Sequence, residues 1–125
     1  MHKHPHYWDT EGVKHEINEW SPAHEADKAI SYLRNEGNVR DPNKPFFMMV
    51  SFNPPHSPYA SLEDCMEEDY NLYKDLPLDS LLIRPNANRE IKKAPSVRYY
   101  FASVTGVDRA FGRILDELEK QGLDK

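Results

Sequence analysis

The sequence predicts an α/β fold in which helices flank a mixed sheet, with this chain supplying only part of the sheet. Two segments, one starting at Ser21 and one spanning 96–121, have the three- and four-residue spacing of apolar side chains that is typical of amphipathic helices. Between them lies a short, nearly continuous apolar run, 46–52, that suits a buried strand. A lone strand cannot pair its own backbone N–H and C=O groups, so we expect the sheet to be incomplete here.

The first predicted helix begins at Ser21 and has Pro22 at its first helical position, where the missing N–H of proline costs nothing. Its apolar side chains fall on one face: Ala26, Ala29, Ile30 and Leu33. Gly37 is the expected C-cap, because glycine readily adopts the left-handed conformation in which many helices end. The segment is therefore predicted to bury one face against another element.

The apolar run 46–52 reads FFMMVSF and shows no alternation of polar and apolar residues. This pattern is typical of a strand buried on both faces, as in a sheet covered by helices. A buried helical turn is the alternative. The short length of the run and the stop at Asn53, Pro54 and Pro55 favour the strand.

The longest periodic signal predicts a helix over 96–121, with Ser96 as N-cap and Gly122 as C-cap. Gly106 and Gly112 weaken this helix locally, but a missing Cβ also allows close approach of a neighbouring element. The connection 57–95 has little periodicity, and we expect only short helical turns around 62–73 and 78–82.

Length and composition exclude several classes of protein. With 125 residues the chain is one domain at most, and we treat 1–125 as a single incomplete domain. The net charge of −5 and the absence of a basic run argue against nucleic-acid binding. No apolar stretch approaches the roughly 20 residues that span a bilayer, so no membrane association is expected. The N-terminus has no apolar core of a signal peptide.

His56 is the best candidate for chemistry, because it follows the carboxyl end of the predicted strand, where open α/β sheets place their ligands. Pro54, Pro55 and Pro58 restrict the surrounding backbone and would hold the imidazole in a defined direction. The imidazole could contact an anionic oxygen or pass a proton to a leaving group. A histidine that is merely hydrogen-bonded in a proline-rich loop remains the alternative.

Other polar groups give weaker signals. His2, His4 and His6 alternate, so an extended chain could direct them to one side for a metal, although a mobile terminus or a binding loop is favoured. Cys65 lies in an acidic stretch that disfavours a reactive thiolate. The acidic cluster 63–69 is interpreted as a solvated face. A polar loop offers donors for an anionic substrate or for water: Arg84, Asn86, Asn88 and Arg89.

Three segments together resemble the formylglycine-dependent sulfatases of the alkaline-phosphatase superfamily. WSPAHEADKAISYL (20–33) is similar to the family helix that precedes the central strand, and KPFFMMVSFNPPHSPY (44–59) to that strand and its histidine loop. RYYFASVTGVDRAFGRILDELEKQGLDK (98–125) is similar to the long helix that follows. The resemblance implies that this chain is a central segment of a sulfatase catalytic domain, with part of an alkaline-phosphatase-like mixed sheet flanked by helices.

By this resemblance His56 is the catalytic histidine that contacts the sulfate group, and His4, His6 and Tyr7 contribute to substrate binding. The Cys-x-Pro/Ala-x-Arg motif that yields the formylglycine nucleophile is absent, as are the family's metal-ligand motifs. The resemblance implies a divalent cation, calcium, in the full-length enzyme, and no metal bound to this chain through the family ligands.

The implied function is hydrolysis of sulfate esters, with a sulfated carbohydrate as the expected substrate and another sulfate ester as the alternative. The enzyme is expected to be periplasmic or secreted, and this segment alone is expected to be inactive. A non-catalytic binding protein derived from the fold is the alternative. It would associate with itself or with another chain through an unpaired strand and an apolar helix face. A phosphodiesterase or phosphatase relative is a further alternative.

Overall fold

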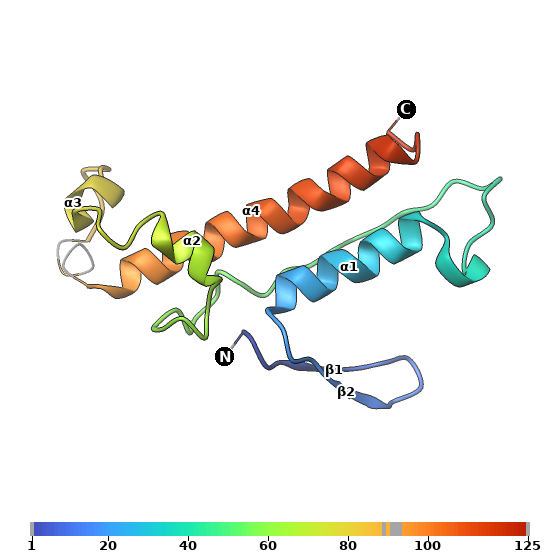
Figure 1. Ribbon diagram of the computed structural model, residues 1–125, viewed down its shortest axis with the longest axis horizontal. Coiled ribbons are helices and arrows are strands. Elements are labelled where there is room, and N and C mark those ends of the chain that lie inside the picture. The colour runs from blue at the N-terminus through green and yellow to red at the C-terminus, as the bar shows by residue number, and fades with distance from the viewer. Residues whose placement is uncertain (1, 89, 91–93, 125) are drawn as a thin grey trace.

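The computed structural model describes residues 2–88, 90 and 94–124, which form a helical pair with a hairpin at one end (Figure 1). The elements follow in the order β1 (His6–Trp8), β2 (Lys14–Glu16), α1 (Ser21–Leu33), the 3-10 turn η1 (Glu36–Asn38), α2 (Glu67–Asn71), α3 (Leu78–Leu81) and α4 (Ser96–Lys120). Among the described residues, no helix combines the length and apolar character that a membrane crossing requires.

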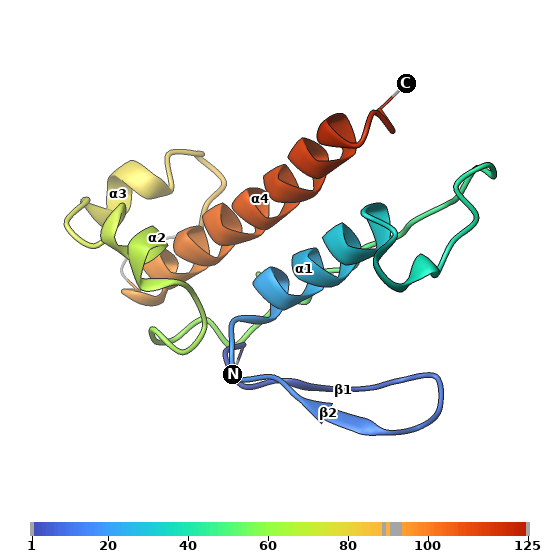
Figure 2. The same cartoon turned by 45° about the vertical axis from the view of Figure 1, so that its right-hand side comes forward.

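The core lies between α1 and α4, which run side by side in both views (Figures 1 and 2). The apolar face predicted for the first helix is buried there, with Leu33 only 1% exposed. It meets the apolar face of α4 through Ala110 and Ile114. Burying such side chains stabilises the fold by about 1.5–3 kcal/mol each. The two predicted helices and their buried faces are therefore confirmed.

The end of α1 differs from the prediction. The helix stops at Leu33, and Asn35, with φ of 56°, takes the left-handed position that was expected at Gly37. The N–H of Asn35 donates to the carbonyl of Tyr32 at 3.0 Å and so satisfies one of the free carbonyls of the last turn. Asparagine tolerates positive φ better than most residues. Gly37, with φ of 74°, lies in the following turn instead.

The end of α4 matches the prediction closely. Gly122 has φ of 65° and its N–H donates to the Glu119 carbonyl at 2.9 Å, while Leu123 N–H donates to the Leu118 carbonyl at 3.0 Å. This is the Schellman pattern, completed by the packing of Leu118 and Leu123 on the helical core. At the other end, Pro95 rather than Ser96 precedes the helix, so the predicted N-cap was wrong by one residue.

The predicted strand 46–52, hereafter the extended segment, has no paired strand among the described residues. It runs alongside the helical pair (Figure 1), and its alternate side chains pack on the core: Phe46, Met48, Val50 and Phe52. Phe47 and Met49 point outward and are 89% and 80% exposed. Burial on both faces is therefore wrong for this chain, because one face and both backbone edges have no partner in the described part of the structure.

The N-terminal residues form a hairpin that the sequence did not predict; a mobile terminus or a binding-loop segment was favoured instead. β1 and β2 pair antiparallel, with Tyr7 opposite His15. The turn is held by Asp9, whose carboxylate accepts from the backbone N–H groups of Glu11 and Val13, both at 2.9 Å. His15 donates to the same carboxylate at 2.8 Å. These contacts lower the pKa of Asp9, chiefly through the His15 hydrogen bond.

The acidic cluster 63–69 is not uniformly solvated. Asp64 and Asp69 are 2% and 0% exposed. Asp69 lies on α2, which packs on α4, and Asp64 lies in the loop before this helix. Asp69 pairs with Arg109, and Asp64 accepts from the N–H of Ala60 at 3.0 Å. The helices α2 and α3 are shorter than the turns predicted at 62–73 and 78–82.

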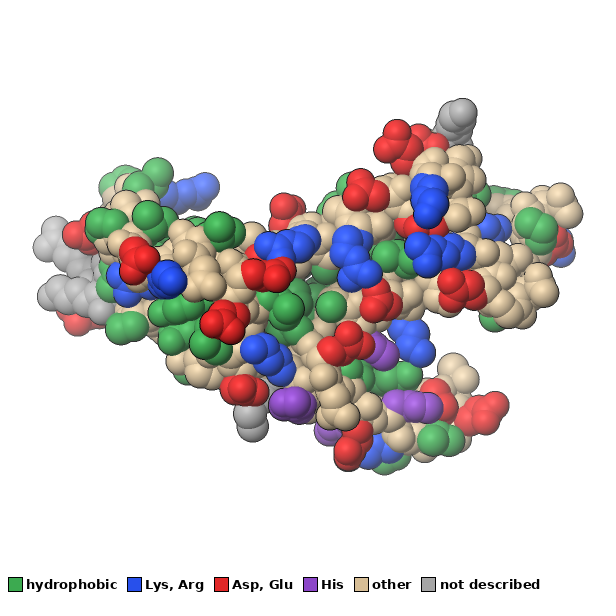
Figure 3. All heavy atoms as spheres, in the orientation of Figure 1, with side chains coloured by type: hydrophobic (Ala, Val, Ile, Leu, Met, Phe, Trp, Pro, Cys, Tyr) green, Lys and Arg blue, Asp and Glu red, His purple; other side chains and the backbone are tan. Residues whose placement is uncertain are grey.

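The predicted polar loop is solvated where it is described: Arg84, Asn86 and Asn88 are exposed, and Arg89 lies outside the described residues. Acidic and basic side chains interleave over the helices on the face seen in Figure 3.

Candidate functional site

The His56 loop follows the extended segment directly. The backbone N–H of His56 donates to the carbonyl of Asn53 at 3.0 Å, which closes a turn. The ring atom Nδ1 lies 2.8 Å from the carbonyl oxygen of Ser57. Because a carbonyl can only accept, Nδ1 must carry a proton in this contact. The remaining ring atom, Nε2, can then accept a proton when the ring is neutral or donate one when it is charged.

His56 is exposed, so its ring can meet a ligand from solvent. The backbone of this loop contacts the side chain of His2, a buried residue that is only 4% exposed. The Nε2 atom of His2 lies 2.9 Å from the carbonyl oxygen of His56 and 3.1 Å from that of Pro58. The arrangement therefore consists of one exposed imidazole on a loop that a second, buried imidazole supports.

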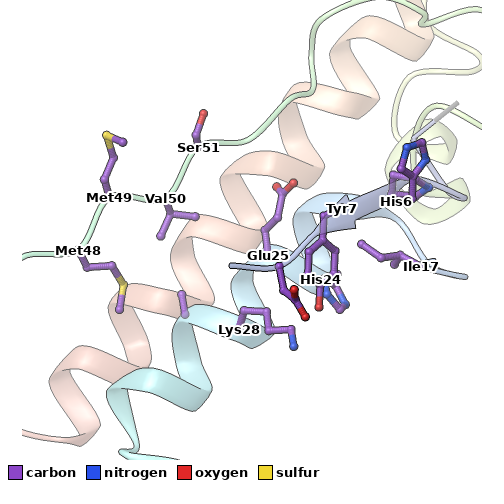
Figure 4. Close-up of a pocket in the computed structure, with 13 residues that line it drawn as sticks. His6, Tyr7, Ile17, His24, Glu25, Lys28, Met48, Met49, Val50 and Ser51 are labelled. Atoms are coloured by element: carbon purple, nitrogen blue, oxygen red, sulfur yellow. The ribbon is translucent and has the colours of Figure 1, made fainter. Parts of the chain in front are cut away.

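A cavity of about 620 Å³ lies between the hairpin, α1 and the extended segment (Figure 4). Its lining is mainly apolar and includes Ile17, Met48 and Val50. Its polar groups come from the hairpin, from α1 and from the extended segment: His6, Tyr7, Asp9, His24, Glu25, Lys28 and Ser51. An apolar cavity with a few converging polar groups has the character of a small-molecule site.

Tyr7 is the centre of an aromatic cluster in this cavity. Its ring stacks on His15 with centroids 4.9 Å apart, and His24 lies 5.7 Å away in a tilted arrangement. The Nζ atom of Lys28 lies 5.8 Å from the Tyr7 centroid, within cation–π range. The ring is thus held in place from three sides.

The polar wall contributed by α1 carries both signs of charge. Burial raises the pKa of Glu25, although the nearby His24 opposes this shift. His24 itself pairs through Nδ1 with the carboxylate of Glu19 at 2.9 Å. Sequence reasoning missed His24, Glu25 and Lys28. Their i, i+1 and i+4 spacing on the polar side of the helix was the available signal.

The structure brings together two of the four predicted site residues. His6 and Tyr7 both line the cavity, whereas His4 lies 3.8 Å from Glu63 and His56 lies on its own loop. The three alternating histidines do not converge: His2 turns inward to the His56 loop, while His4 and His6 are exposed. The possible metal site built from these three is therefore excluded by their placement.

Cys65 is fully buried, and burial raises the pKa of its thiol to about 11. The carboxylates of Asp69 and Asp64 raise it further, while Lys3 opposes them. A thiol with so high a pKa is protonated at neutral pH and is a poor nucleophile. The interpretation of Cys65 as an unreactive residue is supported, although burial rather than the acidic setting is the main cause.

A helical pair beside an extended segment that ends in a histidine loop is the arrangement expected for part of an alkaline-phosphatase-like α/β fold. The sulfatase family model matches residues 3–125. The chain therefore belongs to the sulfatase family, whose members are sulfuric ester hydrolases. This membership favours a sulfatase over a phosphatase or phosphodiesterase relative.

Curated relatives support the same family. The chain is 71% identical to an endo-4-O-sulfatase of Bacteroides thetaiotaomicron over 124 residues, which cover 99% of this chain and 24% of that protein. It is 31% identical to an arylsulfatase of Clostridium perfringens, with coverage of 76% of this chain and 22% of that one. The chain thus spans about a quarter of the length of these relatives.

Solved structures have the same backbone arrangement. A structure from Bacteroides thetaiotaomicron, described in connection with the metabolism of multiple glycosaminoglycans, superposes with a TM-score of 0.92 at 71% identity. The superposed region covers 99% of this chain and 26% of the Bacteroides thetaiotaomicron chain. A Bacteroides fragilis structure assigned to the sulfatases superposes with a TM-score of 0.78 at 32% identity, over 98% of this chain and 27% of that one.

Sulfatase membership suggests a divalent cation in the enzyme. Within residues 2–88, 90 and 94–124, no group of three or more His, Cys, Asp or Glu side chains is placed to hold a metal ion. The described residues therefore do not fit such a cation.

Proposed function

We propose that this sequence is the central part of a longer sulfatase that hydrolyses 4-O-sulfate esters of glycosaminoglycans. The observation that carries the proposal is the 71% identity to an endo-4-O-sulfatase across 99% of the chain, together with a backbone match of TM-score 0.92. Such identity over so much of the chain supports a shared substrate class, although the site residues here supply only part of the reaction.

In this proposal His56 contacts the sulfate group. The hydrogen bond from Nδ1 to the Ser57 carbonyl directs Nε2 outward, where a protonated ring can donate to a sulfate oxygen. The same atom can donate a proton to the leaving alcohol oxygen as the sulfur–oxygen bond breaks. General acid–base help of this kind contributes typically 10²–10⁴-fold to a rate.

We further propose that His6 and Tyr7 bind the carbohydrate from the cavity and that His4, which lies beside Glu63, contributes to the same binding. The ring of Tyr7, fixed by His15 and Lys28, offers an apolar surface beside polar groups, which suits a sugar. The nucleophile and the divalent cation, for which the family resemblance predicts formylglycine and calcium, belong to the rest of the longer chain. A periplasmic or secreted location likewise stays a prediction from that resemblance.

The test uses a complete enzyme, in which residues 1–125 replace the matching quarter of the Bacteroides thetaiotaomicron endo-4-O-sulfatase. Sulfate released from a 4-O-sulfated glycosaminoglycan is measured by ion chromatography. We expect the hybrid to be active and His56→Ala to lower kcat by about 10²–10⁴-fold. Lys44→Ala, an exposed change in the loop before the extended segment, is the matched control and should retain activity. An active His56→Ala hybrid would refute the assigned role.

The 125-residue chain alone is expected to release no sulfate from the same substrate, because it lacks the nucleophile motif. Turnover by the purified chain that disappears in His56→Ala would contradict this expectation.

A second candidate function is association with itself or with another chain. The observation that favours it is the outward face of the extended segment, where Phe47 and Met49 are 89% and 80% exposed. Light scattering coupled to size-exclusion chromatography tests it, since a monodisperse monomer that unfolds cooperatively would count against association.

A further inference from the structure

We propose that His2 is a positioning residue, which fixes the orientation of the His56 imidazole through the backbone of the loop that carries it. The inference rests on the proposed catalytic role of His56. Nothing in the sequence pattern suggested it, because His2 and His56 are 54 positions apart.

Three successive carbonyl groups in the loop each lie within hydrogen-bond distance of a histidine ring nitrogen. The carbonyls of His56 and Pro58 both lie within hydrogen-bond distance of His2 Nε2, at 2.9 and 3.1 Å. The carbonyl between them, that of Ser57, accepts from Nδ1 of the His56 ring at 2.8 Å. The group that orients the catalytic ring is therefore flanked on both sides by groups that His2 holds.

This arrangement ties the direction of the ring to His2. Each peptide unit is planar, so two fixed carbonyls restrict the rotation of the peptide unit between them. If His2 no longer donated, the Ser57 carbonyl could turn away from Nδ1. The His56 ring would then lose the contact that selects its tautomer and direction.

His2 is itself anchored to the start of α1. Its carbonyl accepts from the N–H of Ser21 at 2.9 Å, and its side chain is buried. The His56 loop is thereby linked to the helical pair rather than only to the extended segment. The donation from Nε2 is available both in the neutral tautomer that carries a proton there and in the charged ring, so it does not depend on the charge of His2.

The test compares four changes in the hybrid enzyme described above, with a 4-O-sulfated glycosaminoglycan as substrate. His2→Leu removes the donor, and His2→Asn places an amide too close to the backbone to reach the loop. His2→Gln places an amide nitrogen with two donors near the position of Nε2. Lys3→Leu is the control, because it makes the same replacement at the next residue.

We expect His2→Leu and His2→Asn to lower kcat by about 10- to 100-fold, with KM within about threefold, since small misplacement of a catalytic group has effects of this size. His2→Gln should restore kcat to within about threefold. In the His56→Ala background, His2→Leu should cause no further loss, because a residue that acts through His56 has nothing left to position.

Three results would overturn the inference: full activity of His2→Leu, equal kcat for His2→Asn and His2→Gln, or an undiminished effect of His2→Leu in the His56→Ala background. If His2→Leu does not fold, as judged by thermal unfolding, the comparison of the two amides still decides. Failure of the proposed function looks different, because His56→Ala itself would then remain active.

Discussion

The helical pair and the extended segment both carry apolar side chains but have very different surroundings. In the pair, α1 and α4 supply each other's partners, and Leu33 and Ile114 are 1% and 4% exposed. In the extended segment only alternate residues reach that core, and Phe47 and Met49 remain in solvent. A helix satisfies its own backbone and needs one apolar neighbour, whereas a strand needs partners at two edges and on two faces.

This chain therefore holds a complete helix–helix contact and an incomplete sheet. The same contrast decides how mutations should behave. Changes in the helical pair should alter the stability of the chain, whereas changes on the outer face of the extended segment should alter what the chain associates with.

The largest expected effect is that of Ile114→Ala. This change leaves a cavity in the core between the helices and should lower the free energy of unfolding by about 2–5 kcal/mol. Phe47→Ala, although it removes a larger side chain, should change it by no more than about 0.5 kcal/mol, because Phe47 is solvated. Urea denaturation of the 125-residue chain measures both free energies of unfolding. Similar losses of stability for the two variants would contradict the difference in burial between the helical pair and the outer face of the extended segment.

The two glycines of α4 should respond in opposite directions. A Cβ at Gly106 would lie 2.5 Å from Trp20 Cη2 and 2.8 Å from Asp69 Oδ2, so Gly106→Ala should destabilise by about 1–3 kcal/mol. A Cβ at Gly112 meets nothing within 4 Å, and Gly112→Ala should stabilise by up to about 1 kcal/mol through helix propensity. Thermal unfolding compares them, and destabilisation by both would contradict the close packing at Gly106.

The free energy of unfolding is expected to depend on pH through an ion pair between α4 and the end of α1. Arg34 donates to both carboxylate oxygens of Glu117, through Nε and Nη2 at 2.9 Å each, and this lowers the pKa of Glu117 from 4.5 to about 2. A carboxyl with a lowered folded pKa stabilises the fold above its unfolded pKa, and this contribution is lost as the pH falls toward 2.

Glu117→Gln should therefore be less stable than the parent at pH 7, and the gap should narrow as the pH falls from 4.5 toward 2. Urea midpoints measured across this range provide the test. A gap that stays constant with pH would show that the ion pair is not its source.

The smallest effect on stability is expected for Phe47→Lys combined with Met49→Lys. Unfolding free energy should stay within about 0.5 kcal/mol of the parent, because both side chains already face solvent. If the parent self-associates, light scattering should show weaker association of this variant. Val39→Lys is the matched control, since Val39 is 64% exposed but lies outside the extended segment. If Val39→Lys weakened association to the same extent, the outer face of the extended segment would not be the association surface.

Much of the fold could be predicted because its signals are local. The spacing of apolar residues located both helices, and Gly122 marked the end of α4 through its own backbone freedom. The hairpin could not be predicted in this way. It depends on Asp9, whose side chain closes the turn, and its three-residue strands are too short for a period-two pattern to be recognised.

The candidate site was only partly predictable. The end of a predicted strand located His56, and the family resemblance indicated His6 and Tyr7, which do line the cavity. The roles of His24 and Lys28 depend on the packing of α1 against the hairpin. Their spacing indicates only a shared polar side of α1, whereas the contact of that side with the hairpin joins residues far apart in the chain.

The two amphipathic helices, the apolar extended segment and the position of His56 directly after it follow from the order of residues, because each depends on neighbouring residues. The burial of Asp69 and the contact of His2 with the His56 loop arise from the packing of distant segments. The same packing decides which face of the extended segment meets the helices. Burial and long-range hydrogen bonds depend on which surfaces meet in space, and the order of residues does not specify that directly.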